Sequence, residues 1–181
     1  MRESIFKIID NAPLTQTVYK MKLQGDVSDI TSSGQFVNIK LDGLYLRRPI
    51  SVCDCEGDVL TLIYKVVGKG TEQMAKMTAG EELNILTGLG NGYDLSLSGD
   101  KPLLLGGGVG VPPLYMLAKK LIAEGKKVSV VLGFNTKEEV FCEEDFKALG
   151  ADVFVTTVDG SYGIKGFVTD AMKDIDYSYL Y

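Results

Sequence analysis

The fold of the C-terminal half is decided by residues 101–113, which read Lys-Pro-Leu-Leu-Leu-Gly-Gly-Gly-Val-Gly-Val-Pro-Pro. Lys101–Leu105 has the apolar composition of a short buried strand, and a proline pair suits the first turn of a following helix. Glycines in such a loop let a phosphate approach backbone N–H groups beside a helix N-terminus. We therefore predict nucleotide binding here, although a tight strand-to-helix turn alone would also require glycine. The loop glycines are Gly106, Gly107, Gly108 and Gly110.

Beyond this loop the chain alternates between helical and strand patterns. The order predicts parallel strands wrapped by helices, with ligand-binding loops at the C-terminal ends of the strands. The tail, residues 177–181, resembles a strand that is just beginning, so we expect this chain to be the front portion of a longer one. The expected elements are a helix with Leu114, Leu117, Ala118, Leu121 and Ile122 on one face, strand Val128–Leu132, helix Glu143–Leu149, strand Asp152–Thr157, loop Asp159–Gly166 and helix Phe167–Lys173.

The first 99 residues contain six short β patterns separated by turn signals, which predict a closed or nearly closed antiparallel barrel. A helix from about Thr71 to Met77 interrupts them, and Gly80 is its expected C-cap glycine. We predict two domains, a barrel over residues 1–99 and an α/β domain over residues 100–181 that is incomplete at its C-terminus. The expected strands are Ser4–Ile9, Thr17–Lys22, Gln35–Leu41, Leu46–Asp54, Val59–Val67 and Glu82–Leu86, with a turn at Asn11-Ala12-Pro13.

The composition excludes several classes of function. The chain has 181 residues and a net charge of −5, so we expect no nucleic-acid partner. It has no histidine, which excludes histidine metal sites and catalysis by a histidine base. Cys53, Cys55 and Cys142 do not form a metal-binding pattern, and we expect them to be reduced thiols in strands of a cytoplasmic protein. The sequence shows no signal peptide or membrane span, so no membrane partner is expected either.

Two motifs in the first half have the chemistry of a phosphate site. Arg47-Arg48-Pro49-Ile50-Ser51 places adjacent arginines on a β segment, and a guanidinium can donate two parallel hydrogen bonds to a phosphate. Gly68-Lys69-Gly70-Thr71 leads into the short helix, where backbone N–H groups and a hydroxyl could hold an anion. Each motif also has a simpler interpretation, a solvated arginine pair and a turn with an N-cap threonine. The second half lacks both the G-x-G-x-x-G and the P-loop patterns, which disfavours an NAD site of the usual Rossmann type.

Together these motifs resemble the ferredoxin-reductase-like flavoprotein family, and within it the electron-transfer subunits of class 1B dihydroorotate dehydrogenases. The matching segments follow the family order over nearly the whole chain. They are Gly34-Gln35-Phe36-Val37, Leu46-Arg47-Arg48-Pro49-Ile50-Ser51, Tyr64-Lys65-Val66-Val67-Gly68-Lys69-Gly70-Thr71, Leu89-Gly90-Asn91-Gly92-Tyr93, Gly106-Gly107-Gly108-Val109-Gly110-Val111-Pro112-Pro113 and Asp159-Gly160-Ser161-Tyr162-Gly163.

The resemblance implies a set of site residues. Arg48, Pro49, Ile50 and Ser51 would hold FAD, with Arg48 on the pyrophosphate and Ser51 near the reactive nitrogen of the flavin. Backbone groups of Ile63, Tyr64 and Lys65 would line the flavin, and Gly70 and Thr71 would bind its phosphates. The glycine loop, together with Asp159 and Gly160, would accept NAD(H). Many relatives carry an aromatic residue where Ile50 stands, and Tyr64 is the alternative candidate for stacking on the flavin.

The resemblance also implies a function and a partner. Electrons would pass from a dihydroorotate-oxidising FMN subunit to FAD and then to NAD⁺ in pyrimidine biosynthesis, within a heterotetramer. The cysteines that ligate the [2Fe–2S] cluster of full-length relatives lie beyond residue 181, so we expect no cluster in this chain, in which a [2Fe–2S] centre would lack its four thiolates. No arginine follows Arg48, which favours NAD(H) over NADP(H), with Lys137 as the nearest alternative contact for a 2′-phosphate. Alternative functions are the reductase subunit of another NAD(P)H-linked redox complex and a non-catalytic nucleotide- or partner-binding fragment.

Overall fold

The computed structural model describes residues 1–181, and the chain divides into two compact units, Met1–Tyr93 and Asp94–Tyr181. The division comes slightly before the predicted boundary between residues 99 and 100. Each unit has its own sheet and its own buried core.

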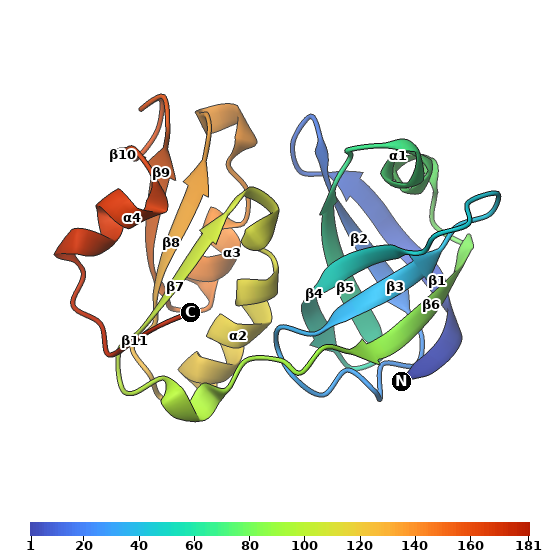
Figure 1. Ribbon diagram of the computed structural model, residues 1–181, viewed down its shortest axis with the longest axis horizontal. Coiled ribbons are helices and arrows are strands. Elements are labelled where there is room, and N and C mark those ends of the chain that lie inside the picture. The colour runs from blue at the N-terminus through green and yellow to red at the C-terminus, as the bar shows by residue number, and fades with distance from the viewer. The chain divides into compact units, whose positions relative to one another are not determined.

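The first unit is a closed six-stranded barrel with the strand order β1-β2-β5-β4-β3-β6, and all neighbouring strands are antiparallel (Figure 1). This confirms the predicted barrel. Alternating side chains fill its interior, as in β3, where Val37 and Ile39 are buried while Lys40 is exposed. The strands are β1 (Arg2–Pro13), β2 (Val18–Gln24), β3 (Phe36–Lys40), β4 (Arg48–Glu56), β5 (Val59–Lys65) and β6 (Glu82–Leu89).

The first strand is longer than predicted, because the expected turn at Asn11-Ala12-Pro13 is its C-terminal end. Pro13 pairs with Tyr19, and the chain reverses only afterwards, where the N–H of Leu14 donates to the carbonyl of Val18 at 2.8 Å. Proline is tolerated at this position because the end of a strand does not require its missing N–H. The extension places Asn11, which pairs with Met21 of β2, where its side chain reaches the C-terminal end of α1.

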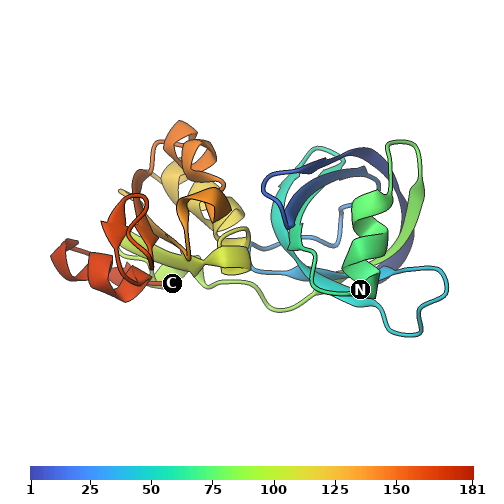
Figure 2. The same cartoon turned by 90° about the horizontal axis from the view of Figure 1, so that it is seen from above.

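Helix α1 (Lys69–Lys76) lies across one end of the barrel, as Figures 1 and 2 both show. Its apolar anchor is Met74, which is fully buried. The predicted C-cap glycine is wrong: the helix ends at Met77, whose backbone is extended. Gly80 instead turns the chain into β6 with a φ of +97°, and its N–H donates to the carbonyl of Ile8 at 2.9 Å.

The second unit is a five-stranded parallel sheet in the order β10-β9-β8-β7-β11. Helices α2 and α3 cover one face and α4 covers the other (Figures 1 and 2). Tail strand β11 is confirmed, whereas β10 lies inside a segment that was expected to be only a loop. The elements are η1 (Leu95–Leu97), β7 (Pro102–Gly107), η2 (Gly108–Gly110), α2 (Pro113–Ala123), β8 (Ser129–Phe134), η3 (Lys137–Glu139), α3 (Glu143–Ala148), β9 (Asp152–Thr157), β10 (Ile164–Lys165), α4 (Val168–Ala171), η4 (Met172–Asp174) and β11 (Tyr179–Leu180).

None of the three cysteines forms a disulfide, and two of them lie in β4. Cys142 does not lie in a strand as expected. It occupies the N-cap position of α3 with a φ of +63°, the only positive φ outside the glycines. None of the helices is both long and apolar enough to cross a membrane.

Candidate functional site

The two adjacent arginines point to different parts of the barrel. Arg47 lies with its Nη2 3.0 Å from Oε1 of Glu3, and its Nη1 donates to the carbonyl of Asn38 at 3.2 Å. A hydrogen bond from Asn84, and after it the charge of Arg47, holds the pKa of Glu3 below its ordinary value. Arg47 is therefore paired within the protein, which leaves Arg48 as the arginine with the free charge.

Arg48 lies over the start of α1. A Cβ at Gly70 would overlap Nε of Arg48 and would come within 2.9 Å of its Cζ, so only glycine lets the guanidinium lie against this turn. Nη1 of Arg48 donates to the carbonyl of Leu46, and no carboxylate pairs with either Arg48 or the neighbouring Lys69. The first N–H groups of a helix lack intrahelical acceptors. An unpaired guanidinium and free amides therefore converge at one point, which fits the pyrophosphate of a dinucleotide.

The hydroxyl of Thr71 forms hydrogen bonds within the turn that leads into α1. It accepts hydrogen bonds from the N–H groups of Val67 at 2.9 Å and Gly68 at 3.3 Å, and it donates to the carbonyl of Gly68 at 3.0 Å. Thr71 is only 7% exposed, so this hydroxyl closes the turn into the helix. What Thr71 can offer a phosphate is its backbone N–H.

The edges of β4 and β5 separate next to Ser51. Their ladder runs from Glu56 opposite Val59 to Val52 opposite Leu62 and ends there. Arg48–Ser51 then pairs only with β3, and Ile63–Lys65 pairs only with β2. Backbone groups of Ile63–Lys65 that face β4 are consequently free of ladder hydrogen bonds, as a ligand held through backbone groups requires. The hydroxyl of Ser51 also has no partner within the protein.

The side chain of Tyr64 is not available to stack on a ligand. The residue is 2% exposed, its ring stacks on Tyr19 with centroids 5.9 Å apart, and its hydroxyl donates to Oδ1 of Asn11 at 3.1 Å. Burial raises the pKa of Tyr64 to about 12. The expectation that Tyr64 replaces the aromatic residue missing at Ile50 is therefore wrong, because this ring fills the barrel interior.

Asn11 is a residue that the sequence analysis missed. Its Nδ2 donates to the carbonyls of Met74 and Met77, both at 2.9 Å, and so satisfies the C-terminal end of α1. Tyr64 holds the other end of the Asn11 amide, which fixes its orientation. The signal available in the sequence was the Asn-Ala-Pro triplet, which is equally typical of a turn. Asn11 positions α1, and with it the amides beside Arg48.

The four glycines of residues 106–110 differ in why the structure needs a glycine at each position. A Cβ at Gly106 would lie 2.8 Å from Cδ1 of Leu114 and 3.0 Å from Cα of Val111, so Gly106 lets α2 pack against β7. Gly108 has a φ of +51°, which favours glycine. Gly107 and Gly110 are exposed, and a Cβ at either would meet no atom closer than 3.8 Å. These two positions leave open space along the loop, where a ligand could approach the backbone.

The start of α2 offers few hydrogen-bond donors. Pro112 and Pro113 have no N–H. The N–H groups of Val111, Leu114 and Tyr115 donate to carbonyls of the preceding turn at 3.1 Å each. Any phosphate at this edge must therefore bind the amides of the loop itself and not those of the helix.

The loops that follow β8 and β9 are hydrogen-bonded to each other. Oγ of Ser161 accepts from the N–H of Lys137 at 2.8 Å and donates to Oδ1 of Asp159 at 2.7 Å. The N–H of Asp159 donates to the carbonyl of Asn135 at 3.2 Å. Hydrogen bonds from Ser161 hold the pKa of Asp159 below its ordinary value, so this carboxylate stays charged. The structure thus brings Asp159 and Gly160 to the carboxyl edge of the sheet that also carries the glycine loop.

Two of the quoted sequence segments are structural. The side chain of Gln35 accepts hydrogen bonds from the N–H groups of Thr31 and Ser32 and donates to the carbonyl of Gly90 at 3.2 Å. The N–H of Tyr93 donates to the carbonyl of Ser33 at 2.8 Å, and the Tyr93 ring lies where a Cβ of Gly34 would be. These segments join the ends of β3 and β6 and need no ligand to explain them.

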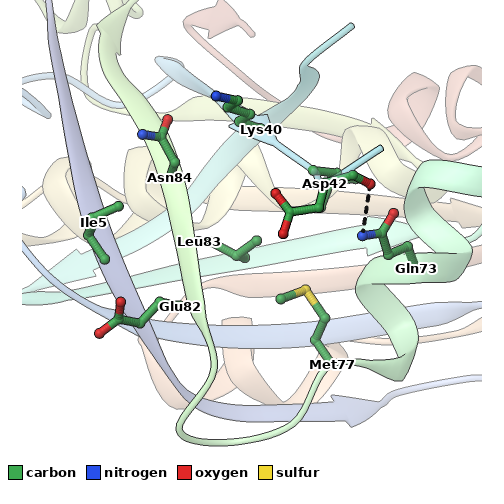
Figure 3. A pocket seen from close by; sticks show the side chains of 9 residues that line it. Ile5, Lys40, Asp42, Gln73, Met77, Glu82, Leu83 and Asn84 are labelled. Carbon is green, nitrogen blue, oxygen red and sulfur yellow. Dashed lines mark hydrogen bonds between the residues drawn. The ribbon is translucent and has the colours of Figure 1, made fainter. Parts of the chain in front are cut away.

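A pocket of about 280 Å³ lies between β1, β6 and the C-terminal half of α1 (Figure 3). None of the predicted site residues lines it. Its lining combines Lys40 with the carboxylates of Asp42 and Glu82, and Gln73 of α1 donates to the carbonyl of Asp42 at 3.4 Å. This hydrogen bond connects the loop between β3 and β4 to α1.

No family model matches the chain. It is 44% identical over 187 residues to the dihydroorotate dehydrogenase B (NAD(+)) electron transfer subunit of Bacillus pumilus, covering 99% of this chain and 72% of that protein. The subunit of the same name from Fusobacterium nucleatum is 47% identical over 174 residues, with 92% and 67% covered. Among solved structures, an NADH-dependent reduced ferredoxin-NADP oxidoreductase, described for flavin-based electron bifurcation, aligns with a TM-score of 0.83 at 33% identity. That alignment covers 93% of this chain and 62% of the oxidoreductase chain.

These likenesses extend through both units and agree with the barrel, the parallel sheet and the glycine loop described above. The extent of the match to the curated relatives decides the family. The chain belongs to the family of electron transfer subunits of dihydroorotate dehydrogenase B (NAD(+)).

Proposed function

We propose that this chain is the FAD-binding electron-transfer part of an NAD-linked dihydroorotate dehydrogenase. The observation that carries the proposal is the convergence of Arg48, Gly70 and the first amides of α1, because an unpaired guanidinium and free N–H groups at one point suit a pyrophosphate. FAD supplies the two-electron chemistry when it is bound. The protein binds and orients it.

Different residues of the first unit bind successive parts of FAD. Arg48 and the N–H groups of Gly70 and Thr71 hold the pyrophosphate, while Pro49, Ile50 and Ser51 continue along β4 beside the flavin. Ser51 offers a free hydroxyl to the reactive nitrogen, and the free backbone edge of Ile63–Lys65 provides further hydrogen bonds to the ring. Asn11 keeps α1 in place for this task.

The second unit binds NAD(H) at the carboxyl edge of its sheet. Gly107, Gly108 and Gly110 give a phosphate access to the loop backbone, and Asp159 and Gly160 lie on the neighbouring loop. We infer a preference for NAD(H) because the loops after β8 and β9 carry Glu138 and Asp159, whose charges repel a 2′-phosphate. Lys137 is the cation that the sequence analysis names as a possible contact for a 2′-phosphate, and its Nζ lies 5.8 Å from the centre of the Tyr162 ring.

The partner is the FMN-containing catalytic subunit that oxidises dihydroorotate, with which the chain forms a heterotetramer. The names of the curated relatives support this, since each is called an electron transfer subunit. In those longer proteins a [2Fe–2S] cluster would connect the two flavins.

Anaerobic titration of the FAD-loaded chain tests the proposal. NADH is expected to bleach the flavin absorption and NADPH to do so at least about tenfold less efficiently, a difference of about 1.4 kcal/mol. A chain that takes up no FAD would contradict the flavin assignment. A tenfold preference for NADPH would contradict only the assignment of the second nucleotide.

A further inference from the structure

The loop between β3 and β4 exposes two large side chains next to Arg48. Tyr45 is 100% exposed and Leu46 is 67% exposed, and Tyr45 makes no contact with a partner group in the protein. The tyrosine ring and the leucine side chain together offer an apolar surface on which another group can lie.

This loop is tied to α1 at both of its ends. Gln73, one turn into the helix, donates to the carbonyl of Asp42 at 3.4 Å (Figure 3). Arg48, which lies against Gly70 in the first turn, donates to the carbonyl of Leu46. The two ends of the loop, Asp42 and Arg48, therefore lie close to α1. Tyr45 lies between these ends, three residues before Arg48 in the chain.

The direction of β4 decides which half of FAD reaches Tyr45. A strand advances about 3.3 Å per residue, so Ser51 lies roughly 10 Å along the strand from Arg48. If the pyrophosphate is at Arg48 and the flavin is near Ser51, the flavin arm extends toward higher residue numbers. The adenosine arm must then leave the pyrophosphate on the other side, where Leu46 and Tyr45 precede Arg48.

We propose that the adenine ring of FAD stacks on Tyr45, with Leu46 covering its edge. The inference rests on the proposed FAD site and adds the residue that recognises the adenine end. Aromatic side chains stack on any base face, and tyrosine does so at a low cost in conformational freedom. The tether from Gln73 and the contact from Arg48 hold the loop in place before FAD binds, which reduces the ordering cost on binding.

Calorimetric titration of the apoprotein with FAD and with FMN tests the proposal, because FMN has the flavin and one phosphate but no adenosine. Tyr45→Ala is expected to weaken FAD binding about tenfold and to leave FMN binding unchanged. Tyr45→Phe, which keeps the ring, is expected to bind FAD like the wild type. Tyr177→Ala, an exposed tyrosine of the second unit, serves as the matched control and is expected to change neither affinity.

The outcomes distinguish a failure of the adenine assignment from a failure of the proposed FAD site. Equal loss of FAD and FMN affinity in Tyr45→Ala, or unchanged FAD affinity, would overturn the adenine assignment while leaving the flavin site in place. A wild-type chain that binds neither ligand would overturn the proposed function and this inference with it. Since Tyr45 is fully exposed, its replacement is expected to leave the thermal unfolding temperature unchanged, which excludes misfolding as the cause of weaker binding.

Discussion

The segments Gly68–Thr71 and Gly106–Gly110 both lead glycine-rich chain into a helix, one in each unit, yet they differ in what surrounds the glycine. At Gly70 the space of a side chain is filled by the guanidinium of Arg48, and the amides of the helix start are free. At Gly107 and Gly110 that space is open, and the helix behind them begins with prolines whose neighbouring amides are already used.

This difference matches the two roles that the units are proposed to have. A fixed cation and free amides favour tight retention of a resident dinucleotide. An open, uncharged loop offers a phosphate backbone contacts without a charge partner, which suits a substrate that must bind and leave. The same residue type is thus proposed to serve a preformed site in the first unit and an accessible one in the second.

The largest loss of ligand affinity is expected from substitutions in the proposed FAD site of the first unit. Arg48→Ala should weaken FAD binding by one to two orders of magnitude, because a charge-assisted hydrogen bond contributes about 1.5–3 kcal/mol. Gly70→Ala should have a comparable effect, since its methyl group takes the place of the guanidinium. Titration with FAD measures both.

Arg47→Ala is the matched control for this pair. It removes an adjacent arginine whose partners are Glu3 and Asn38, so it should leave FAD affinity unchanged and cost less than about 1 kcal/mol of folding free energy. Equal loss of FAD affinity in both arginine variants would show that the site depends on general charge and not on the Arg48–Gly70 contact.

The second site is tested by two glycines that are neighbours in the chain. Gly107→Val places a side chain in the open loop without backbone strain, since φ there is −117°, and should weaken NADH binding at least about tenfold with little loss of stability. Gly106→Ala should instead lower stability by about 1–3 kcal/mol, because the methyl group meets Leu114. NADH titration and urea unfolding separate the two effects, and the reverse pattern would mean that Gly106 lines the ligand site.

A smaller effect is expected at the far end of α1. Asn11→Ala removes both hydrogen bonds to the carbonyls of Met74 and Met77, which should cost about 1–3 kcal/mol in urea unfolding and weaken FAD binding several-fold. Asn11→Asp should cost more, because a carboxylate would face two carbonyl oxygens. If unfolding changes and FAD affinity does not, Asn11 supports the barrel alone.

The effect least connected with ligand binding concerns alkaline pH. Burial raises the pKa of Tyr64 from 10.0 to about 12, so the folded state keeps this proton after the unfolded state has lost it. The stabilisation is present below pH 10 and is lost between pH 10 and about 12, at up to about 1.4 kcal/mol per pH unit. Tyr64→Phe should therefore show a shallower fall of stability in that interval, as measured by urea unfolding at several pH values. An unchanged slope would argue against a buried, protonated Tyr64.

Local patterns explain why much of the fold could be predicted. Alternation along β3 and the helical spacing from Leu114 to Ile122 depend on neighbouring residues only, so the barrel and the α/β unit were both evident. Strand β10 has two residues, too few for any pattern. The end of β1 was hidden because Asn-Ala-Pro is common in turns.

The site residues were harder to predict because their roles depend on contacts between distant segments. The sequence indicated Arg48 and Gly70 separately, but not that one occupies the space of the other's missing side chain. The resemblance named Tyr64 as a candidate for stacking on the flavin, and the ring is instead buried against Tyr19. The Asn-Ala-Pro triplet did not indicate the role of Asn11, since its partners at Met74 and Met77 are far away in the sequence. The assignments of the cofactor-binding residues themselves stay predictions.

Identification of the cofactor that the purified chain retains tests the central claim most directly. The protein should show a flavin spectrum, and the molecule released on denaturation should be FAD, close to one per chain, with FAD lost from Arg48→Ala and kept by Arg47→Ala. A colourless wild-type chain that also fails to take up added FAD would contradict the account.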